Sequence, residues 1–155
     1  MAQLGEGDMA PPFKLPDDSG GEVALASFKG KKLILYFYPK ADTTGCTKEA
    51  NEFNAILTDL DETNAAVVAV SPDSVNALAK FKTKYGLAFA LLGDETHGML
   101  EAYGVWTRKS MYGRSFMGVE RSTFLIGKDG RIAKLWRKVR VDGHATEVLA
   151  AARAL

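Results

Sequence analysis

Residues 33–46 read LILYFYPKADTTGC, an apolar and aromatic run that ends in a polar loop and a cysteine. The run is typical of a buried strand, and a helical pattern follows the loop. Cys46 is therefore expected at a strand-to-helix junction, where the positive end of the helix dipole and free backbone N–H groups surround the sulfur. Because this setting favours the reactive thiolate, we interpret Cys46 as a nucleophile and not as a small buried apolar residue.

A helical stripe begins at this cysteine, with apolar residues at spacings of three and four. Its members are Cys46, Ala50, Phe53, Leu57 and Leu60. A second buried strand is expected over residues 65–70. Ser71-Pro72 then predicts the start of another helix, with Ser71 as the N-cap, Pro72 in the first turn and the helix reaching Tyr85.

The rest of the chain alternates short strands with helical patterns. Strands are expected over residues 89–92, 122–126 and 131–137, and a Gly-containing turn joins the last two. Asp94 predicts the cap of a small helix that ends near Tyr103-Gly104. The stripe of a terminal helix consists of Val148, Leu149, Ala152 and Leu155.

Turn-rich segments near the N-terminus flank two short extended pieces, residues 13–15 and 22–25, which we interpret as a β-hairpin. Residues 105–119 are a polar stretch with aromatics to which we assign no element. The order of elements mixes crossover helices with a final hairpin, which predicts a mixed sheet with helices on both faces. This order suits an α/β thioredoxin-like fold, and 155 residues fit one domain over residues 1–155.

The composition is that of an ordinary globular protein, with 46% hydrophobic and 25% charged residues. Twenty basic and nineteen acidic side chains leave a formal charge of +1, which indicates neither a nucleic-acid nor a membrane partner. Because residues 1–8 lack a basic segment followed by an apolar core, we expect no secretory signal and a cytoplasmic location. One cysteine allows neither an intramolecular disulfide nor a multi-cysteine metal site, and we expect no metal and no cofactor.

A thiolate that attacks a peroxide needs hydrogen-bond donors for the peroxide oxygens and shielding from water. Thr43 lies three residues before Cys46, so its hydroxyl can face the sulfur. Pro39 can cover the thiolate without adding an N–H donor, and the helix start offers the amides of Gly45 and Cys46. A fixed cation is also needed, for which Arg121 is the best candidate, although spacing alone leaves others open: Arg108, Arg114, Arg131 and Arg137.

Residues 36–49, with Pro39, Thr43 and Cys46, resemble the active-site motif P-x-x-x-T-x-x-C of the peroxiredoxins, and in detail the bacterioferritin comigratory protein or peroxiredoxin Q branch. The likeness continues through 7–11, 70–74, 84–87, 103–106, 111–114 and 121–126. It implies a thiol-dependent peroxidase that reduces hydrogen peroxide and organic hydroperoxides, with Cys46 as the peroxidatic cysteine. It also assigns Thr43, Pro39 and Arg121 to the active site.

Two positions depart from this branch. Thr44 stands where the family often has proline, and Asn51 stands where many members carry a resolving cysteine. With one cysteine, an intramolecular disulfide is impossible, so we expect an outside thiol (glutathione, glutaredoxin or thioredoxin) to reduce the Cys46 sulfenic acid. We expect a monomer or a weak homodimer.

A second class of function stays open, in which oxidation of Cys46 serves a peroxide sensor or a redox-regulated binding protein. Peroxide turnover separates this class from an enzyme. A thiol–disulfide oxidoreductase is disfavoured because it needs a C-x-x-C pair, whereas this chain has Thr43-Thr44-Gly45-Cys46. His97 and His144 lack cysteine or carboxylate companions and are expected at surface or capping positions, while Trp106 and Trp136 are expected to pack.

Overall fold

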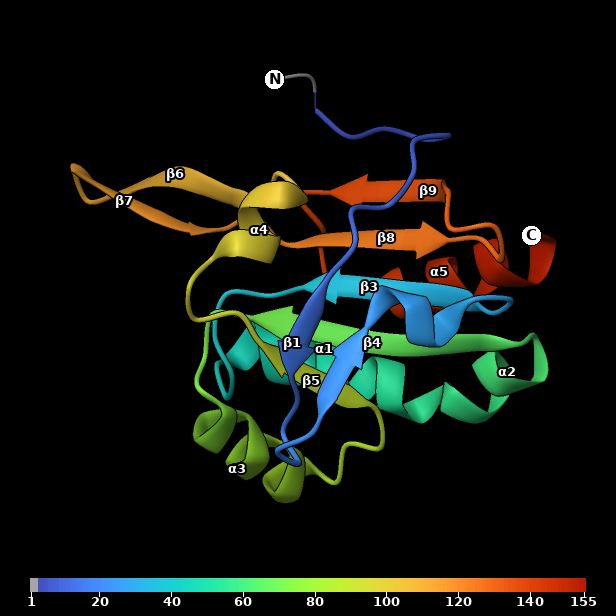
Figure 1. The fold of residues 1–155 in the computed structure, drawn as a ribbon. Helices are drawn as coiled ribbons and strands as arrows, with labels where there is room; N and C mark the ends of the chain where they lie inside the picture. The colour runs from blue at the N-terminus through green and yellow to red at the C-terminus, as the bar shows by residue number, and fades with distance from the viewer. Residues whose placement is uncertain (1–2) are drawn as a thin grey trace.

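A five-stranded mixed sheet forms the centre of the molecule (Figure 1). The computed structural model describes residues 3–155. The strands of this sheet are β3 (Lys32–Phe37), β4 (Ala65–Ser71), β5 (Ala90–Gly93), β8 (Ser122–Ile126) and β9 (Ile132–Arg137). They lie in the order β5-β4-β3-β8-β9, where β3, β4 and β5 are parallel and β8 is antiparallel to both of its neighbours. The predicted mixed α/β sheet is confirmed.

Helices and a small hairpin cover the two faces of the sheet. One face packs against α1 (Thr44–Ala55), α2 (Leu57–Glu62), α3 (Val75–Tyr85) and α5 (His144–Ala154). The other face packs against η1 (Leu25–Phe28), α4 (Gly98–Ala102) and the predicted N-terminal hairpin of β1 (Lys14–Pro16) and β2 (Glu22–Ala24). None of the helices within residues 3–155 is long and apolar enough to cross a membrane.

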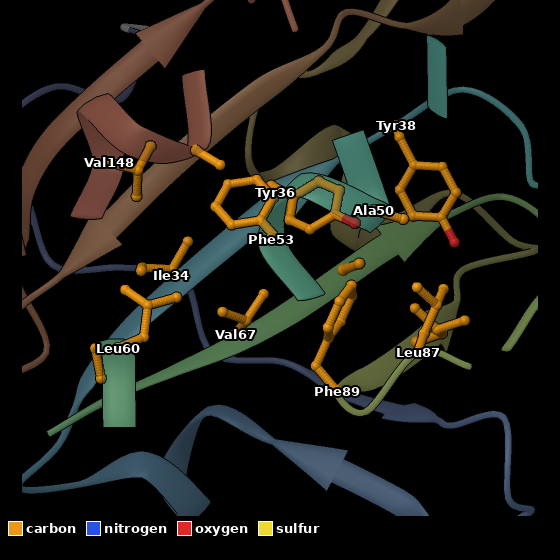
Figure 2. Close-up of a cluster of buried hydrophobic side chains, with 14 of the residues drawn as sticks. Ile34, Tyr36, Tyr38, Ala50, Phe53, Leu60, Val67, Leu87, Phe89 and Val148 are labelled. Carbon is orange, nitrogen blue, oxygen red and sulfur yellow. The ribbon is translucent and has the colours of Figure 1, made fainter. Parts of the chain in front are cut away.

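The side chains of β3 alternate between two cores, as the pleat of a strand requires. Ile34 and Tyr36 lie in the core under α1, whereas Leu35 and Phe37 lie in the core under α4. Figure 2 shows the first of these cores, where Tyr36 stacks on Phe53 with ring centroids 4.8 Å apart. Because α1 is fixed against the central strand in this way, the position of its first turn is also fixed.

Three local predictions are corrected. The helical stripe that begins at Cys46 spans two helices, because Ile56 is not helical and separates α1 from α2. Ser74, not Ser71, is the N-cap of α3, and its side chain accepts a hydrogen bond from the Ala77 amide. Ser71 cannot begin that helix because it is still paired with Gly93 in the sheet. At the C-terminus, Leu155 follows the last helix and is 51% exposed.

Residues 105–119, left unassigned above, contain a second β-hairpin. Its strands are β6 (Trp106–Met111) and β7 (Arg114–Val119), and it extends away from the body of the molecule (Figure 1). Tyr112 and Gly113 form its turn with φ of 52° and 75°, the pair of positive values that a type I′ turn requires. The sequence pattern hid this hairpin because most of its side chains are not in the core, so its strands lack the usual apolar alternation.

We expect Phe53→Ala to lower the free energy of unfolding by about 3–5 kcal/mol, because it leaves a cavity beneath the completely buried ring that stacks on Tyr36. Phe116→Ala is the matched control, since Phe116 is 44% exposed and its loss should cost less than about 1 kcal/mol. Urea unfolding of both variants provides the measurement. Equal losses at the two positions would contradict this account of the core.

Candidate active site

Cys46 is the third residue of α1, directly after the loop that leaves the central strand β3. Its side chain is only 2% exposed and belongs to the core under α1. The Thr47 amide donates to the Thr43 carbonyl oxygen at 2.9 Å. The amides of Gly45 and Cys46 precede this bond in the first turn, where backbone donors have no partner within the helix. The predicted strand-to-helix setting of the cysteine is therefore present.

Arg121 reaches the sulfur from the other side of β3. It lies between β7 and β8, and the antiparallel pairing of Phe37 with Ser122 brings it to the end of β3 from which the cysteine loop leaves. Its Nη2 donates to Cys46 Sγ at 3.2 Å. A fixed positive charge thus lies in direct contact with the cysteine sulfur.

Two of the competing arginines have partners elsewhere. Arg131 Nη1 donates to the Gly7 carbonyl oxygen at 3.0 Å. Arg137 Nη1 lies 3.5 Å from the Gly104 carbonyl oxygen. The remaining two, Arg108 and Arg114, belong to the projecting hairpin and are exposed. Of the five arginines that were candidates for the cation beside the sulfur, Arg121 is the one that contacts Cys46.

Glu49 completes the group, although the sequence analysis gave it no role. It is 1% exposed, and its Oε1 accepts a hydrogen bond from Arg121 Nη1 at 2.6 Å. The signal in the sequence was its spacing, because a residue three positions after Cys46 lies on the same face of the helix. One guanidinium therefore binds a carboxylate with one nitrogen and the sulfur with the other.

The electrostatic balance at Glu49 is set mainly by burial. Burial removes the carboxyl group from water and raises the pKa of Glu49 to about 7. The neighbouring Arg121 guanidinium has the opposite, smaller effect and lowers it. Its second oxygen, Oε2, is buried and has no hydrogen-bond partner among the described residues. Glu49 consequently changes charge near neutral pH while it remains in contact with Arg121.

The other predicted site residues lie on the loop and in the first turn. Thr43 is exposed at the N-cap position, and its hydroxyl donates to the Lys40 carbonyl oxygen at 2.8 Å instead of capping the helix. Pro39 is half-buried, two residues beyond β3. A Cβ added to Gly45 would lie 3.4 Å from Arg121 Nη2, so this glycine leaves room for the guanidinium.

Two carboxylates hold this loop against the ends of neighbouring elements. Asp73 Oδ2 accepts the Ala41 amide at 2.8 Å, which connects the loop to the segment after β4. Asp42 has a positive φ of 62° and accepts hydrogen bonds from Lys84 Nζ at 2.8 Å and the Tyr85 hydroxyl at 2.5 Å. These contacts at the end of α3 stabilise a backbone conformation that is uncommon for residues other than glycine.

Neither histidine has a hydrogen bond to Cys46 or Arg121 among the described residues. The expectation that His144 is at the surface is wrong, because it is buried and its Nε2 lies 2.7 Å from the Thr123 hydroxyl. Burial lowers the pKa of His144 to about 4, so its ring is neutral at neutral pH. His97 stacks on Trp106 with ring centroids 3.9 Å apart. Within residues 3–155, no three His, Cys, Asp or Glu side chains are grouped to hold a metal ion.

Comparison with known proteins identifies the family to which this arrangement belongs. The AhpC/TSA family matches residues 6–135. The chain belongs to this family. It is 48% identical over 143 residues to "Peroxiredoxin Bcp" of Bacillus subtilis, covering 92% of this chain and 91% of that protein. It is also 48% identical over 143 residues to "Putative peroxiredoxin bcp" of Coxiella burnetii, covering 92% of this chain and 95% of that protein.

Solved structures of peroxiredoxins agree with the fold. Peroxiredoxin Q of Xanthomonas campestris superposes with a TM-score of 0.88 at 42% identity, covering 92% of this chain and 90% of that chain. PrxQ of Xylella fastidiosa superposes with a TM-score of 0.94 at 37% identity, covering 99% of this chain and 98% of that chain. The resemblance to the peroxiredoxin Q branch and the thioredoxin-like fold are thus confirmed, and the chain is a thiol-dependent peroxiredoxin.

A Glu49→Gln variant tests the buried carboxyl through the pH dependence of stability. The folded pKa of about 7 exceeds the ordinary 4.5, so between these values the folded state holds a proton that the unfolded chain has released. The contribution of Glu49 to stability is therefore complete below about pH 4.5 and falls as pH rises through about 7. We expect the unfolding free energy of the wild type, relative to Glu49→Gln, to decrease between pH 5 and pH 8 in urea titrations. A difference that does not change with pH would contradict the buried-carboxyl assignment.

Proposed function

We propose that Cys46 is the peroxidatic nucleophile and that it reduces hydrogen peroxide and organic hydroperoxides. The observation that supports this role is the contact between Arg121 Nη2 and Cys46 Sγ at 3.2 Å, in the first turn of a helix. A guanidinium and a helix N-terminus both stabilise negative charge on sulfur. The thiolate is the form of cysteine that attacks peroxide.

The chemical step converts the thiolate to a sulfenic acid. The sulfur attacks the terminal peroxide oxygen, so an S–O bond forms while the O–O bond breaks. The electron pair of the broken bond stays on the leaving oxygen, which takes up a proton and departs as water or as an alcohol. In this proposal, Arg121 and the backbone amides of Gly45 and Cys46 in the first turn of α1 donate to the oxygens, where charge develops in the transition state.

Thr43 and Pro39 have complementary roles in this proposal. The Thr43 hydroxyl donates to Lys40, yet a hydroxyl oxygen keeps lone pairs that can accept a hydrogen bond from the peroxide O–H. Pro39 has no N–H, so it covers one side of the site without competing for the thiolate. Together these residues orient the peroxide toward the sulfur.

Return of Cys46 to the thiolate requires two molecules of an external thiol or one dithiol. A thiolate attacks the sulfenic sulfur, hydroxide leaves as water after protonation, and a mixed disulfide forms. A second thiolate then attacks the disulfide and releases Cys46, so that the reductant leaves as a disulfide. The single cysteine supports this scheme, since the exposed Asn51 occupies the position of a resolving cysteine.

We expect Cys46→Ser to retain the fold and lose peroxidase activity, because a serine hydroxyl stays protonated near neutral pH. The wild type should consume many peroxide molecules per subunit when glutathione or thioredoxin with its reductase is supplied. Peroxide loss is measured under steady-state conditions, with circular dichroism as the check on folding. Substantial turnover by Cys46→Ser would overturn the assignment, and a wild type that stops after one peroxide would be a sensor.

Arg121→Met and Thr43→Val should each slow the oxidation of Cys46 by about 10²–10³, by analogy with the loss of one oxyanion-hole hydrogen bond at a transition state. Arg131→Met is the matched control, because Arg131 contacts the Gly7 carbonyl oxygen at a distant surface. Stopped-flow measurement of a single turnover with hydrogen peroxide isolates this step. A rate near that of the wild type would remove the altered residue from the site.

A further inference from the structure

The projecting hairpin carries most of the large apolar side chains that the molecule leaves exposed. Six such residues have substantial exposure within the described chain, and four belong to β6, β7 or their turn: Met111 (57%), Tyr112 (97%), Phe116 (44%) and Met117 (45%). Exposed apolar groups gathered on one element are characteristic of interaction surfaces. The hairpin stands clear of the body in Figure 1, so a partner can approach it.

The same hairpin is strongly basic. Residues 106–119 contain Arg108, Lys109 and Arg114 but no aspartate or glutamate, which gives this segment a charge of +3 in a chain whose net charge is +1. A surface that combines exposed methionine and aromatic groups with unopposed cations fits a partner that is apolar and acidic.

Cross-strand pairs define one face of the hairpin. Lys109 pairs with Phe116, and Met111 pairs with Arg114, so these four side chains share a face. A Cβ added to Gly118 would lie 3.2 Å from Lys109 Cδ and 3.5 Å from the Phe116 ring, which confirms that both side chains lie over this glycine. We name Lys109, Met111, Arg114 and Phe116 the reductant face.

The base of the hairpin lies close in sequence to the arginine that contacts the cysteine. After Gly118, the chain needs only three more residues to reach Arg121, which contacts the sulfur. Burial and the charge of Arg121 lower the pKa of Lys109, while Cys46 acts on it in the opposite direction. Lys109 is therefore within the electrostatic reach of both groups, and a protein bound to this face would lie beside Cys46.

We propose that the reductant face is the docking surface for a redoxin-type thiol protein whose reactive thiol is surrounded by apolar and acidic side chains. The proposal rests on the function proposed above, in which an outside thiol must reduce the Cys46 sulfenic acid. The docked thiolate attacks the sulfenic sulfur, hydroxide leaves as water after protonation, and a second thiol of the partner releases Cys46 while the partner becomes a disulfide.

The charges favour this occupant over a second copy of the chain. In a two-fold dimer the same patch faces itself, so two hairpins of charge +3 would oppose each other, with only Glu120 beside the base of each hairpin as an acidic neighbour of Lys109. The location favours a thiol protein over an anionic membrane, because a face that leads to Cys46 gives a redox partner access to the atom that it must reduce.

The first turn of α1 can open to meet such a partner. Cys46 is buried, but no side chain caps this helix, and Gly45 in the turn has weak helix propensity. Local opening of an uncapped first turn requires little free energy compared with global unfolding. A partner that is bound to the hairpin can therefore reach the sulfur when this turn opens.

The test compares the two faces of the hairpin with matched changes, each replacing one arginine by glutamate and one large apolar residue by serine. Arg114→Glu/Phe116→Ser alters the reductant face, whereas Arg108→Glu/Met117→Ser makes the same changes on the opposite face, where Arg108 pairs with Met117. Each protein is first oxidised with one equivalent of hydrogen peroxide. Reduction of Cys46 by an acidic thioredoxin and by dithiothreitol is then followed by stopped flow, and mass spectrometry confirms the sulfenic acid.

We expect the reductant-face variant to be reduced by thioredoxin at least tenfold more slowly than the wild type. The opposite-face variant should retain at least half of the wild-type rate, and dithiothreitol should reduce all three proteins equally. Equal thioredoxin rates in the two variants would overturn the proposal. Slowing by dithiothreitol to the same extent would also overturn it, because the effect would then lie at Cys46 itself.

Other outcomes separate the competing occupants and the underlying function. Dimers of the wild type that form through this face would overturn the proposal. Binding of the wild type to phosphatidylglycerol vesicles would also overturn it if thioredoxin reduces the reductant-face variant as fast as the wild type. If peroxide does not oxidise Cys46, the proposed function fails before any reductant is added. In that case, NMR chemical-shift changes on adding thioredoxin to the unoxidised protein test the docking surface independently. If the signals of residues 109–116 do not shift, the proposed docking surface is wrong.

Discussion

The active site depends on one guanidinium that connects two distant parts of the chain. Arg121 and Cys46 are 75 positions apart, yet Nη2 and Sγ lie 3.2 Å from each other. The contact exists because β3 pairs with β4 on one side and with β8 on the other, so the end of β3 meets the start of β8. Packing of α1 against Tyr36 then fixes the cysteine at the same edge. The chemistry is thus a consequence of how the central strand is paired.

Glu49 shows how burial and charge are balanced at this site. A partly buried guanidinium benefits from partners, and Arg121 has one in a carboxylate that is itself almost completely buried. Because burial also raises the pKa of Glu49 to about 7, its negative charge is only partly present at neutral pH. The positive charge of Arg121 is then incompletely neutralised by the carboxylate, and the cysteine sulfur experiences the remainder. Glu49, which no motif position singled out, therefore shares the Arg121 guanidinium with the cysteine sulfur.

The stable body and the hairpin have different physical roles. The body buries alternate sides of β3 in two cores, and the packing of α1 on one of them sets where the cysteine lies in the folded state. The β6–β7 hairpin places four large apolar side chains in water and contributes little to either core. Its position directly before Arg121 gives this exposed surface a structural connection to the active site. The proposed function gives this connection a purpose, because in that proposal the oxidised sulfur is reduced by a group from another molecule.

The sequence by itself determined the elements whose side chains are buried and the chemistry of one loop. The apolar run 33–38, the stripe through Ala50 and Phe53, and the P-x-x-x-T-x-x-C spacing are local patterns, so they were readable without coordinates. Ser71 was misjudged as a helix cap because only pairing with Gly93 keeps it in the sheet. The family motif had already assigned Arg121 to the site, but its contact with the sulfur, its partnership with Glu49 and the burial of His144 were decided by tertiary structure alone. Each depends on residues far apart in the chain, whose proximity follows from strand pairing and the exclusion of water, and these leave no local pattern.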